Sequence, residues 1–163
     1  DVFFFFFYPR FSELMNKYGR VVEYREFKQG SRFSVRDLTI TSVAVNHKVA
    51  ASGYVISDGK TAIGITGDTA ETDDIWPALN SIDNLKSLLI ECAFPNEMSD
   101  LATVSYHLTP QKLERELEKF HNAECEIYVI NMKPMYRDTI IEQIAQLNTK
   151  RLKILEIGKV YEW

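Results

Sequence analysis

The residues of this chain best suited to chemistry stand where apolar segments of the sequence end. His47, Asp68 and Asn131 each follow such a segment, Glu91 lies near the end of another, and His107 precedes the start of a helix. An α/β fold gathers strand ends along one edge of its sheet, where active sites are found. Two histidines and an acid at such an edge could bind a divalent metal ion or act as general acid and base.

Each of these residues also has a purely structural interpretation. Asp68 could cap the helix expected after it, since Asp is a favoured N-cap residue. His47 could be a buried histidine bonded to the backbone, and His107 could be a surface loop residue. Glu91 is either a buried acid with satisfied hydrogen bonds or a member of the site. The residue pattern alone leaves these alternatives open and predicts an α/β protein with a candidate metal site.

Apolar periodicity and turn residues predict the elements that would position these side chains. The dipeptide Asp58-Gly59 predicts a hairpin turn between two strands. We expect strands over residues 21–27, 33–45 (interrupted at 36–37), 52–57, 61–66, 85–94 and 127–130, helices over 11–18, 72–79, 109–120 and 137–147, a loop over 95–105, and a terminal strand pair over 152–163. This order predicts a single α/β domain over residues 1–163, with parallel strands late in the chain.

Composition limits the function classes. The chain has 163 residues, of which 45% are hydrophobic, and a net charge of −4 without a Lys/Arg cluster. We therefore expect a folded domain that does not bind nucleic acid by electrostatics. No apolar run reaches the roughly 20 residues that a membrane helix needs, so no membrane partner is expected. Cys92 and Cys125 lie in apolar segments without CxxC spacing, which predicts buried free thiols in a reducing compartment and a cytoplasmic protein.

The N-terminus carries an unusual apolar block. Residues 2–7 consist of a valine and five consecutive phenylalanines, without the basic residues that begin a signal peptide. A strand buried on both faces has this composition. We expect the block to pack against a preceding segment or against a second copy of the chain.

Four segments, in this order and spacing, resemble part of a known enzyme family. They are Val45-Asn46-His47 followed by SGYVI (residues 52–56), ITGDT (65–69), SYHLTP (105–110) and INMKP (130–134). Together they resemble the C-terminal half of the metallo-β-lactamase fold, in the branch of class II 3′,5′-cyclic-nucleotide phosphodiesterases and their tRNA-processing relatives. The resemblance implies an α/β fold of the αββα sandwich type, of which this chain would be the C-terminal part.

The resemblance also implies a role for individual residues. Asp68 would be the carboxylate that bridges two divalent ions, expected to be Zn²⁺. His107 would act on the leaving group or the phosphate, and His47 would shape the site from behind. In such a site two ions activate a bridging water for in-line attack on phosphorus.

The implied substrate is a small-molecule phosphodiester. A 3′,5′-cyclic nucleotide, hydrolysed to the nucleoside monophosphate, is the leading candidate. The alternatives are an ester or thioester hydrolase of the same fold, and a non-catalytic module that dimerises or binds a nucleotide.

The sequence departs from the family pattern at most of the metal ligands. The family's His-x-His-x-Asp-His motif is absent and, with the next histidine ligand, is expected before Asp1. The last ligand, a histidine in His-x-Lys-Pro, is replaced by Asn131, whose neutral, hard amide oxygen binds zinc poorly. We expect either the C-terminal part of a larger enzyme or a degenerate, inactive descendant. An apolar face left without its second sheet favours a homodimer in both cases.

Overall fold

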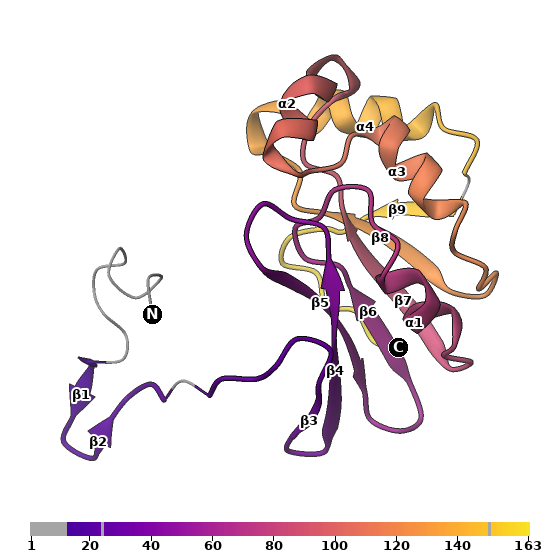
Figure 1. Cartoon of the computed structure of the whole chain (residues 1–163). Coiled ribbons are helices and arrows are strands. Elements are labelled where there is room, and N and C mark those ends of the chain that lie inside the picture. The colour runs from indigo at the N-terminus through magenta and orange to yellow at the C-terminus, as the bar shows by residue number, and fades with distance from the viewer. Residues whose placement is uncertain (1–12, 24, 150) are drawn as a thin grey trace.

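The computed structural model describes residues 13–23, 25–149 and 151–163, and its main feature is a seven-stranded sheet in the order β3-β4-β5-β6-β7-β8-β9. A two-stranded hairpin, β1-β2, stands apart from this sheet (Figure 1). The strands are β1 (Met15–Asn16), β2 (Gly19–Arg20), β3 (Arg32–Val35), β4 (Leu38–Val45), β5 (Ala51–Ser57), β6 (Ala62–Ile65), β7 (Leu85–Glu91), β8 (Glu126–Ile130) and β9 (Leu152–Ile154). The helices are α1 (Ile75–Asn80), α2 (Ser99–Ser105), α3 (Pro110–Leu117) and α4 (Arg137–Ala145). The apolar block of residues 2–7 lies outside the described residues.

Short turns build the antiparallel half of the sheet, from β3 to β6. Between β5 and β6, Asp58 Oδ1 accepts hydrogen bonds from the backbone N–H groups of Lys60 (2.8 Å) and Thr61 (2.7 Å). Gly59 adopts φ 90°, which glycine tolerates without steric cost. The predicted Asp58-Gly59 hairpin and the strands on both sides of it are therefore confirmed.

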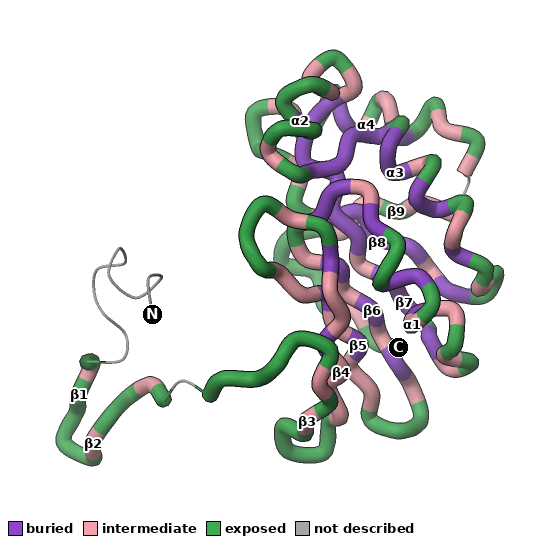
Figure 2. Tube along the Cα trace, in the orientation of Figure 1, coloured by how far each residue is buried: buried purple, intermediate pink, exposed green. Residues whose placement is uncertain are grey.

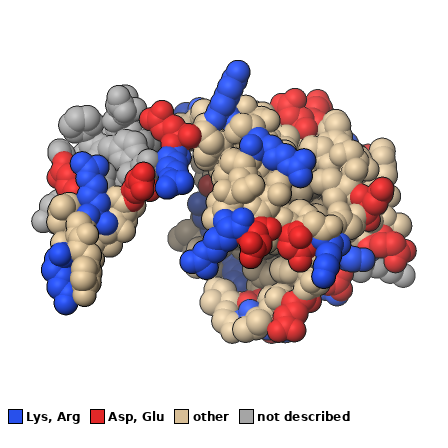
Figure 3. All heavy atoms as spheres, turned by 90° about the horizontal axis from the view of Figure 1, so that it is seen from below, with Lys and Arg blue, Asp and Glu red and all other residues tan. Residues whose placement is uncertain are grey.

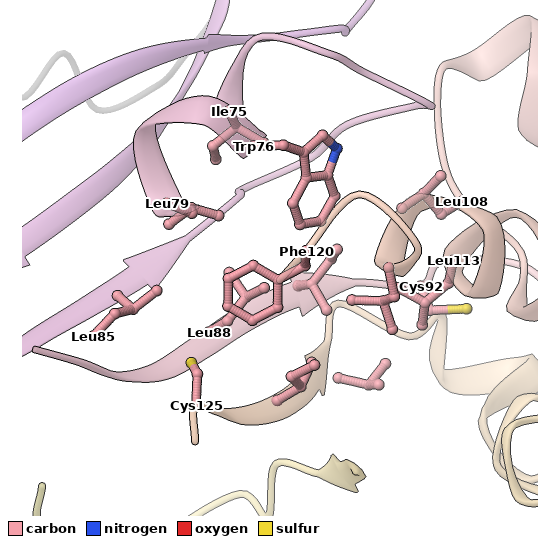
Figure 4. Close-up of a cluster of buried hydrophobic side chains, with 14 of the residues drawn as sticks. Ile75, Trp76, Leu79, Leu85, Leu88, Cys92, Leu108, Leu113, Phe120 and Cys125 are labelled. Carbon is pink, nitrogen blue, oxygen red and sulfur yellow. The ribbon is translucent and has the colours of Figure 1, made fainter. Parts of the chain in front are cut away.

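Helical crossovers join the parallel half, from β6 to β9, and cover one face of the sheet. The pairs β6–β7, β7–β8 and β8–β9 are all parallel, which confirms the prediction of parallel strands late in the chain. Side chains of α1, α3 and α4 share one buried cluster with those of the strands, and Figure 2 shows the burial concentrated there. Figure 4 shows Ile75, Trp76 and Leu79 of α1 above Leu85 and Leu88 of β7. Cys92 and Cys125 are buried free thiols, as predicted.

Two glycines allow α1 to lie close to the sheet. A Cβ on Gly53 would lie 2.5 Å from Ile75 Cδ1 and 2.9 Å from the Ile65 carbonyl oxygen. A Cβ on Gly64 would lie 2.6 Å from Leu79 Cδ2. The side chains of α1 thus occupy the space that larger residues in β5 and β6 would fill. This packing also fixes the end of the loop that connects β6 to α1.

The pairing directions place several strand ends at one edge of the sheet. β4 and β6 both run antiparallel to β5, so they run in the same direction, and β7 and β8 run parallel to β6. The carboxyl ends of these strands therefore share an edge. His47, Asp68, Glu91 and Asn131 lie at those ends, as the sequence pattern predicted.

The predictions near the N-terminus are wrong for the described residues. The helix expected over 11–18 is replaced from residue 15 onward by the β1-β2 hairpin. Asn16 Oδ1 accepts a hydrogen bond of 2.8 Å from the backbone N–H of Tyr18, a local contact that favours a turn over a helix. The described part of 21–27 forms no strand, so alternating apolar residues there do not mark a buried face.

Three later predictions also differ from the structure. The loop expected over 95–105 contains a 3-10 turn (Asn96–Met98) and helix α2. Only Ala102 of α2 is buried, so this helix carries no apolar stripe that a sequence pattern could show. The terminal strand pair expected over 152–163 reduces to β9, which pairs with β8. Helix α1 begins at Ile75, later than residue 72.

The second face of the sheet carries apolar side chains that are only partly buried. Strand register aligns Ile40, Ile56 and Ile63 in one row, and Ile65 and Leu89 in the next. All five are of intermediate burial. The C-terminal tail packs on part of this face, where the ring centroids of Tyr128 and Tyr161 lie 5.1 Å apart.

The charged side chains form a mixed pattern. On the face drawn in Figure 3, basic and acidic residues are interspersed between uncharged surface. In the described part of the chain, no helix is both long and apolar enough to cross a membrane.

Candidate metal-binding site

His47, Asp68 and His107 come together at the edge of the sheet. One possible ligand atom of each residue lies within 4.8 Å of the other two. The ring centroids of His47 and His107 are 5.4 Å apart. The three residues come from the ends of β4 and β6 and from the turn between α2 and α3. The structure thus brings together the two histidines and the acid that the sequence indicated.

Hydrogen bonds hold the loops after β4 and β6 against each other. The backbone N–H of Ala70 donates to the carbonyl oxygen of Asn46 (2.7 Å), and Asn46 Nδ2 donates to the carbonyl oxygen of Glu71 (2.8 Å). Gly67 adopts φ 64°, so the chain can turn sharply before Asp68. These contacts fix the distance between the two loops and therefore between His47 and Asp68.

Asp68 is exposed and caps no helix. The N-cap position of α1 is Asp74, six residues later in the chain. Asp68 Oδ1 instead accepts a hydrogen bond of 2.8 Å from Asn131 Nδ2, which comes from the end of β8. The helix-cap interpretation of Asp68 is wrong, and its carboxylate belongs to the cluster at the sheet edge.

Glu91 is a fully buried acid whose carboxylate contacts the imidazole ring of His107. Its Oε1 lies 2.7 Å from His107 Nδ1 and accepts a hydrogen bond of 2.8 Å from the backbone N–H of Thr69. Its Oε2 accepts a hydrogen bond of 3.3 Å from the backbone N–H of Leu108. Both sequence alternatives for Glu91 therefore hold, because it is a satisfied buried acid and also a member of the site.

The Glu91–His107 contact sets the protonation of both groups. Burial raises the pKa of the Glu91 carboxyl above its ordinary value, and the hydrogen bonds from His107 and Thr69 oppose that rise. The hydrogen bond to Glu91 raises the pKa of His107, while burial and the ammonium group of Lys133 oppose that rise. Because the Glu91 carboxylate accepts several hydrogen bonds, we assign the Nδ1 proton of His107 to this contact, which leaves Nε2 facing the site.

His47 indicates that the cluster fits a cation. Both ring nitrogens are buried and have no hydrogen-bond partner among the described residues. An unpaired buried polar group costs about 1–3 kcal/mol, which coordination to a metal ion would offset at one nitrogen. Imidazole nitrogen and carboxylate oxygen are ordinary zinc ligands. The ligand atoms that His47, Asp68 and His107 offer therefore fit one divalent ion.

Two further side chains, Phe94 and Lys133, lie near His107. The Phe94 ring centroid lies 5.7 Å from that of His107, and Lys133 Nζ lies 5.8 Å from the Phe94 centroid. A hollow of about 380 Å³ adjoins the site at Asn131, and Met132 and Arg137 also line it. Phe94 and Arg137 carried no signal in the sequence, because no spacing rule connects them with the cluster.

Solved structures share the fold of this chain. The metallo-β-lactamase fold protein YhfI from Bacillus subtilis matches with a TM-score of 0.65 and 19% identity, over 80% of this chain and 52% of that protein. The short form of human tRNase Z matches with a TM-score of 0.54 and 14% identity, over 76% of this chain and 42% of that enzyme. Zn²⁺-bound PqqB from Methylobacterium extorquens matches with a TM-score of 0.59 and 15% identity, over 84% of this chain and 55% of that protein. The chain thus spans about half the length of these relatives.

None of the curated protein sequences compared matches the chain significantly, but a family model does. The family model described as a β-lactamase superfamily domain matches residues 7–128, which is most of the chain. Together with the sheet topology and the shared fold, this match shows that the chain belongs to the metallo-β-lactamase superfamily.

Proposed function

We propose that this chain forms part of the active site of a metal-dependent phosphodiesterase, with a 3′,5′-cyclic nucleotide as the leading substrate. The observation that carries the proposal is the His47–Asp68–His107 cluster with Glu91 behind it. A site with metal ligands on one side and a carboxylate-supported histidine on the other suits the hydrolysis of a phosphoester. We assign His47 as a metal ligand, beyond the shaping role implied by the resemblance, because its ring nitrogens are buried and unpaired.

The residues of the site have two roles: His47 and Asp68 would hold the metal ion, and His107 would protonate the leaving oxygen. A divalent ion held by His47 and Asp68 would supply a water of lowered pKa and neutralise charge on the phosphate. Water adding to phosphorus would give up a proton to solvent, and the bond from phosphorus to the leaving oxygen would break. His107 gives its Nε2 proton to the leaving oxygen, and the Glu91 carboxylate stabilises the proton on Nδ1 and fixes the ring.

Several features support a phosphoester as the substrate. The tRNase Z neighbour bears the name of an enzyme that cleaves RNA, and the PqqB neighbour is Zn²⁺-bound. The hollow at Asn131 offers partly apolar walls and the guanidinium group of Arg137, which suits the nucleoside part of a nucleotide.

Hydrolysis of 3′,5′-cyclic AMP and of bis(p-nitrophenyl) phosphate tests the proposal. Asp68→Ala should reduce activity to background, because it removes a metal ligand. His107→Ala should lower kcat by about 10²–10⁴-fold, the usual contribution of a positioned acid. The control is Asp83→Ala, which removes an exposed acid before β7, away from the cluster, and should leave both rates unchanged. Activity that survives Asp68→Ala would contradict the assignment of the site.

A second candidate is a non-catalytic module that dimerises. The observation that favours it is the partly buried apolar face formed by Ile40, Ile56, Ile63, Ile65 and Leu89. Tight binding of a cyclic nucleotide without hydrolysis, in protein that carries zinc, would select this alternative over the phosphodiesterase.

A further inference from the structure

Asn131 occupies a position that commits its side chain to Asp68. It is the first residue after β8 and adopts a left-handed conformation, with φ 58°. Asparagine tolerates this region better than most residues. On either side, the backbone is anchored to β7 and its extension. The N–H of Cys92 donates to the Ile130 carbonyl oxygen (3.1 Å), and the N–H of Lys133 donates to the Ala93 carbonyl oxygen (3.2 Å). The main chain therefore holds Asn131 at the sheet edge.

The Asn131 amide presents a donor to the carboxylate. Nδ2 lies 2.8 Å from Asp68 Oδ1. The orientation of the amide follows from chemistry, because a carboxylate oxygen accepts hydrogen bonds and would repel the amide oxygen. An N–H group that points at Oδ1 also repels a cation approaching that oxygen from the same side. A carboxylate that bridges two ions presents one oxygen to each, so Asp68 has one oxygen left for a metal.

We infer that Asn131 replaces the second metal ion of the site, so that the chain holds a single divalent ion through His47 and Asp68. This inference deepens the proposed function and rests on it for the identity of Asp68 and His47 as ligands. The amide fixes the orientation of Asp68, as a second cation would, but adds no positive charge and no activated water. The phosphodiester hydrolysis proposed above then relies on one ion and on the proton from His107.

Metal stoichiometry tests the inference without any substrate. The full chain is freed of metal, equilibrated with Zn²⁺, dialysed, and analysed for zinc per chain. We expect one ion in the wild type and two in Asn131→His, whose imidazole removes the donor and adds a ligand. Histidine also tolerates a left-handed backbone, so this variant should fold. Asn131→Asp is the second gain-of-ligand variant, because a second carboxylate beside Asp68 attracts a cation.

A matched control separates loss of the amide from gain of a ligand. Asn131→Ala removes the hydrogen bond without supplying a donor atom and should stay at one ion. Mn²⁺ electron paramagnetic resonance distinguishes an isolated ion in the wild type from a spin-coupled pair in Asn131→His. Spin coupling requires the two ions to be close together, so it shows that the second ion is not bound elsewhere on the surface.

The possible outcomes distinguish the single-ion inference from the proposed metal-dependent function. Two ions in the wild type would overturn the inference and leave the metal-dependent function intact. One ion in the wild type and in both gain-of-ligand variants would show that Asn131 is not what excludes the second ion. A wild type that binds no ion would overturn the inference together with the metal assignment of the proposed function.

Discussion

At the scale of single residues, the buried Glu91 carboxylate controls the protonation of His107. Its hydrogen bond at 2.7 Å raises the pKa of His107 above the ordinary value of 6.5. The folded chain therefore binds the His107 proton more tightly than the unfolded chain does. The stability from this contact is fully present below the unfolded pKa, and it is lost as the pH rises through the raised folded pKa.

Glu91→Gln tests this control in metal-free protein. Glutamine has a similar shape and can still accept the backbone N–H groups of Thr69 and Leu108, but it carries no charge. We expect the pKa of His107, followed by NMR of the imidazole resonances, to fall toward or below 6.5 in the variant. Glu97→Gln changes an exposed acid that bonds to Gln143 instead, and it should not move the His107 titration. An unchanged His107 pKa in Glu91→Gln would mean that the carboxylate does not control the ring.

The same substitution has a catalytic consequence under the proposed function. Loss of the carboxylate partner of a metal-bound histidine typically costs 10–100-fold in metal affinity or activity, and we expect kcat of Glu91→Gln to fall by about the same factor. The high-pH limb of the kcat profile should also move to lower pH, because the acid loses its proton more easily. A fall in kcat with no movement of that limb would indicate a merely structural role for Glu91.

At the scale of elements, the close approach of α1 to β5 and β6 positions the loop that carries Asp68. Gly53→Ala should destabilise the fold by about 1–3 kcal/mol, the usual cost of overpacking. The added methyl group would meet Ile75 Cδ1 at 2.5 Å and the backbone oxygen of Ile65 at 2.9 Å, and backbone cannot move aside as a side chain can. Urea unfolding followed by circular dichroism measures the change.

Ser52→Ala provides the control on the same strand. Its side chain points to the opposite face of β5, so the free energy of unfolding should change by less than about 0.5 kcal/mol. Equal stabilities for Gly53→Ala and the wild type would show that α1 can shift away from the sheet without cost.

At the scale of the whole molecule, the half-buried apolar face bears on oligomeric state. The sequence resemblance favours a homodimer, and we keep this as a prediction. Ile40, Ile56 and Ile63 form a row across adjacent strands of this face, with intermediate burial. Such a row is costly to leave in water, and pairing with a second copy would cover it.

Light scattering after size exclusion tests the dimer. The wild-type chain should elute with twice the mass of one chain, and Ile63→Asp should shift the population to monomer, because it places a charge within the row. Leu101→Asp alters an exposed apolar residue on α2 and should leave the dimer intact. A monomeric wild type at the highest soluble concentration would show that the face is not a dimer interface.

The sequence by itself determined the parts of this protein that depend on local chemistry. The Asp58-Gly59 turn and the helix predicted to begin at residue 109 each follow from neighbours within a few positions, and both are found in the structure. Family membership follows from such segments in order. Helix α2 escaped prediction because a helix with one buried residue has no apolar period.

Only the tertiary structure decided which side chains of the candidate site contact one another. Asp68 caps no helix because α1 begins at Ile75, and its carboxylate bonds instead to Asn131, 63 positions away in the chain. Glu91 became a partner of His107 only through its hydrogen bond, and the unpaired nitrogens of His47 are visible only in three dimensions. The physical reason is that a site at a sheet edge joins the ends of strands whose order and direction are set by pairing across the whole chain.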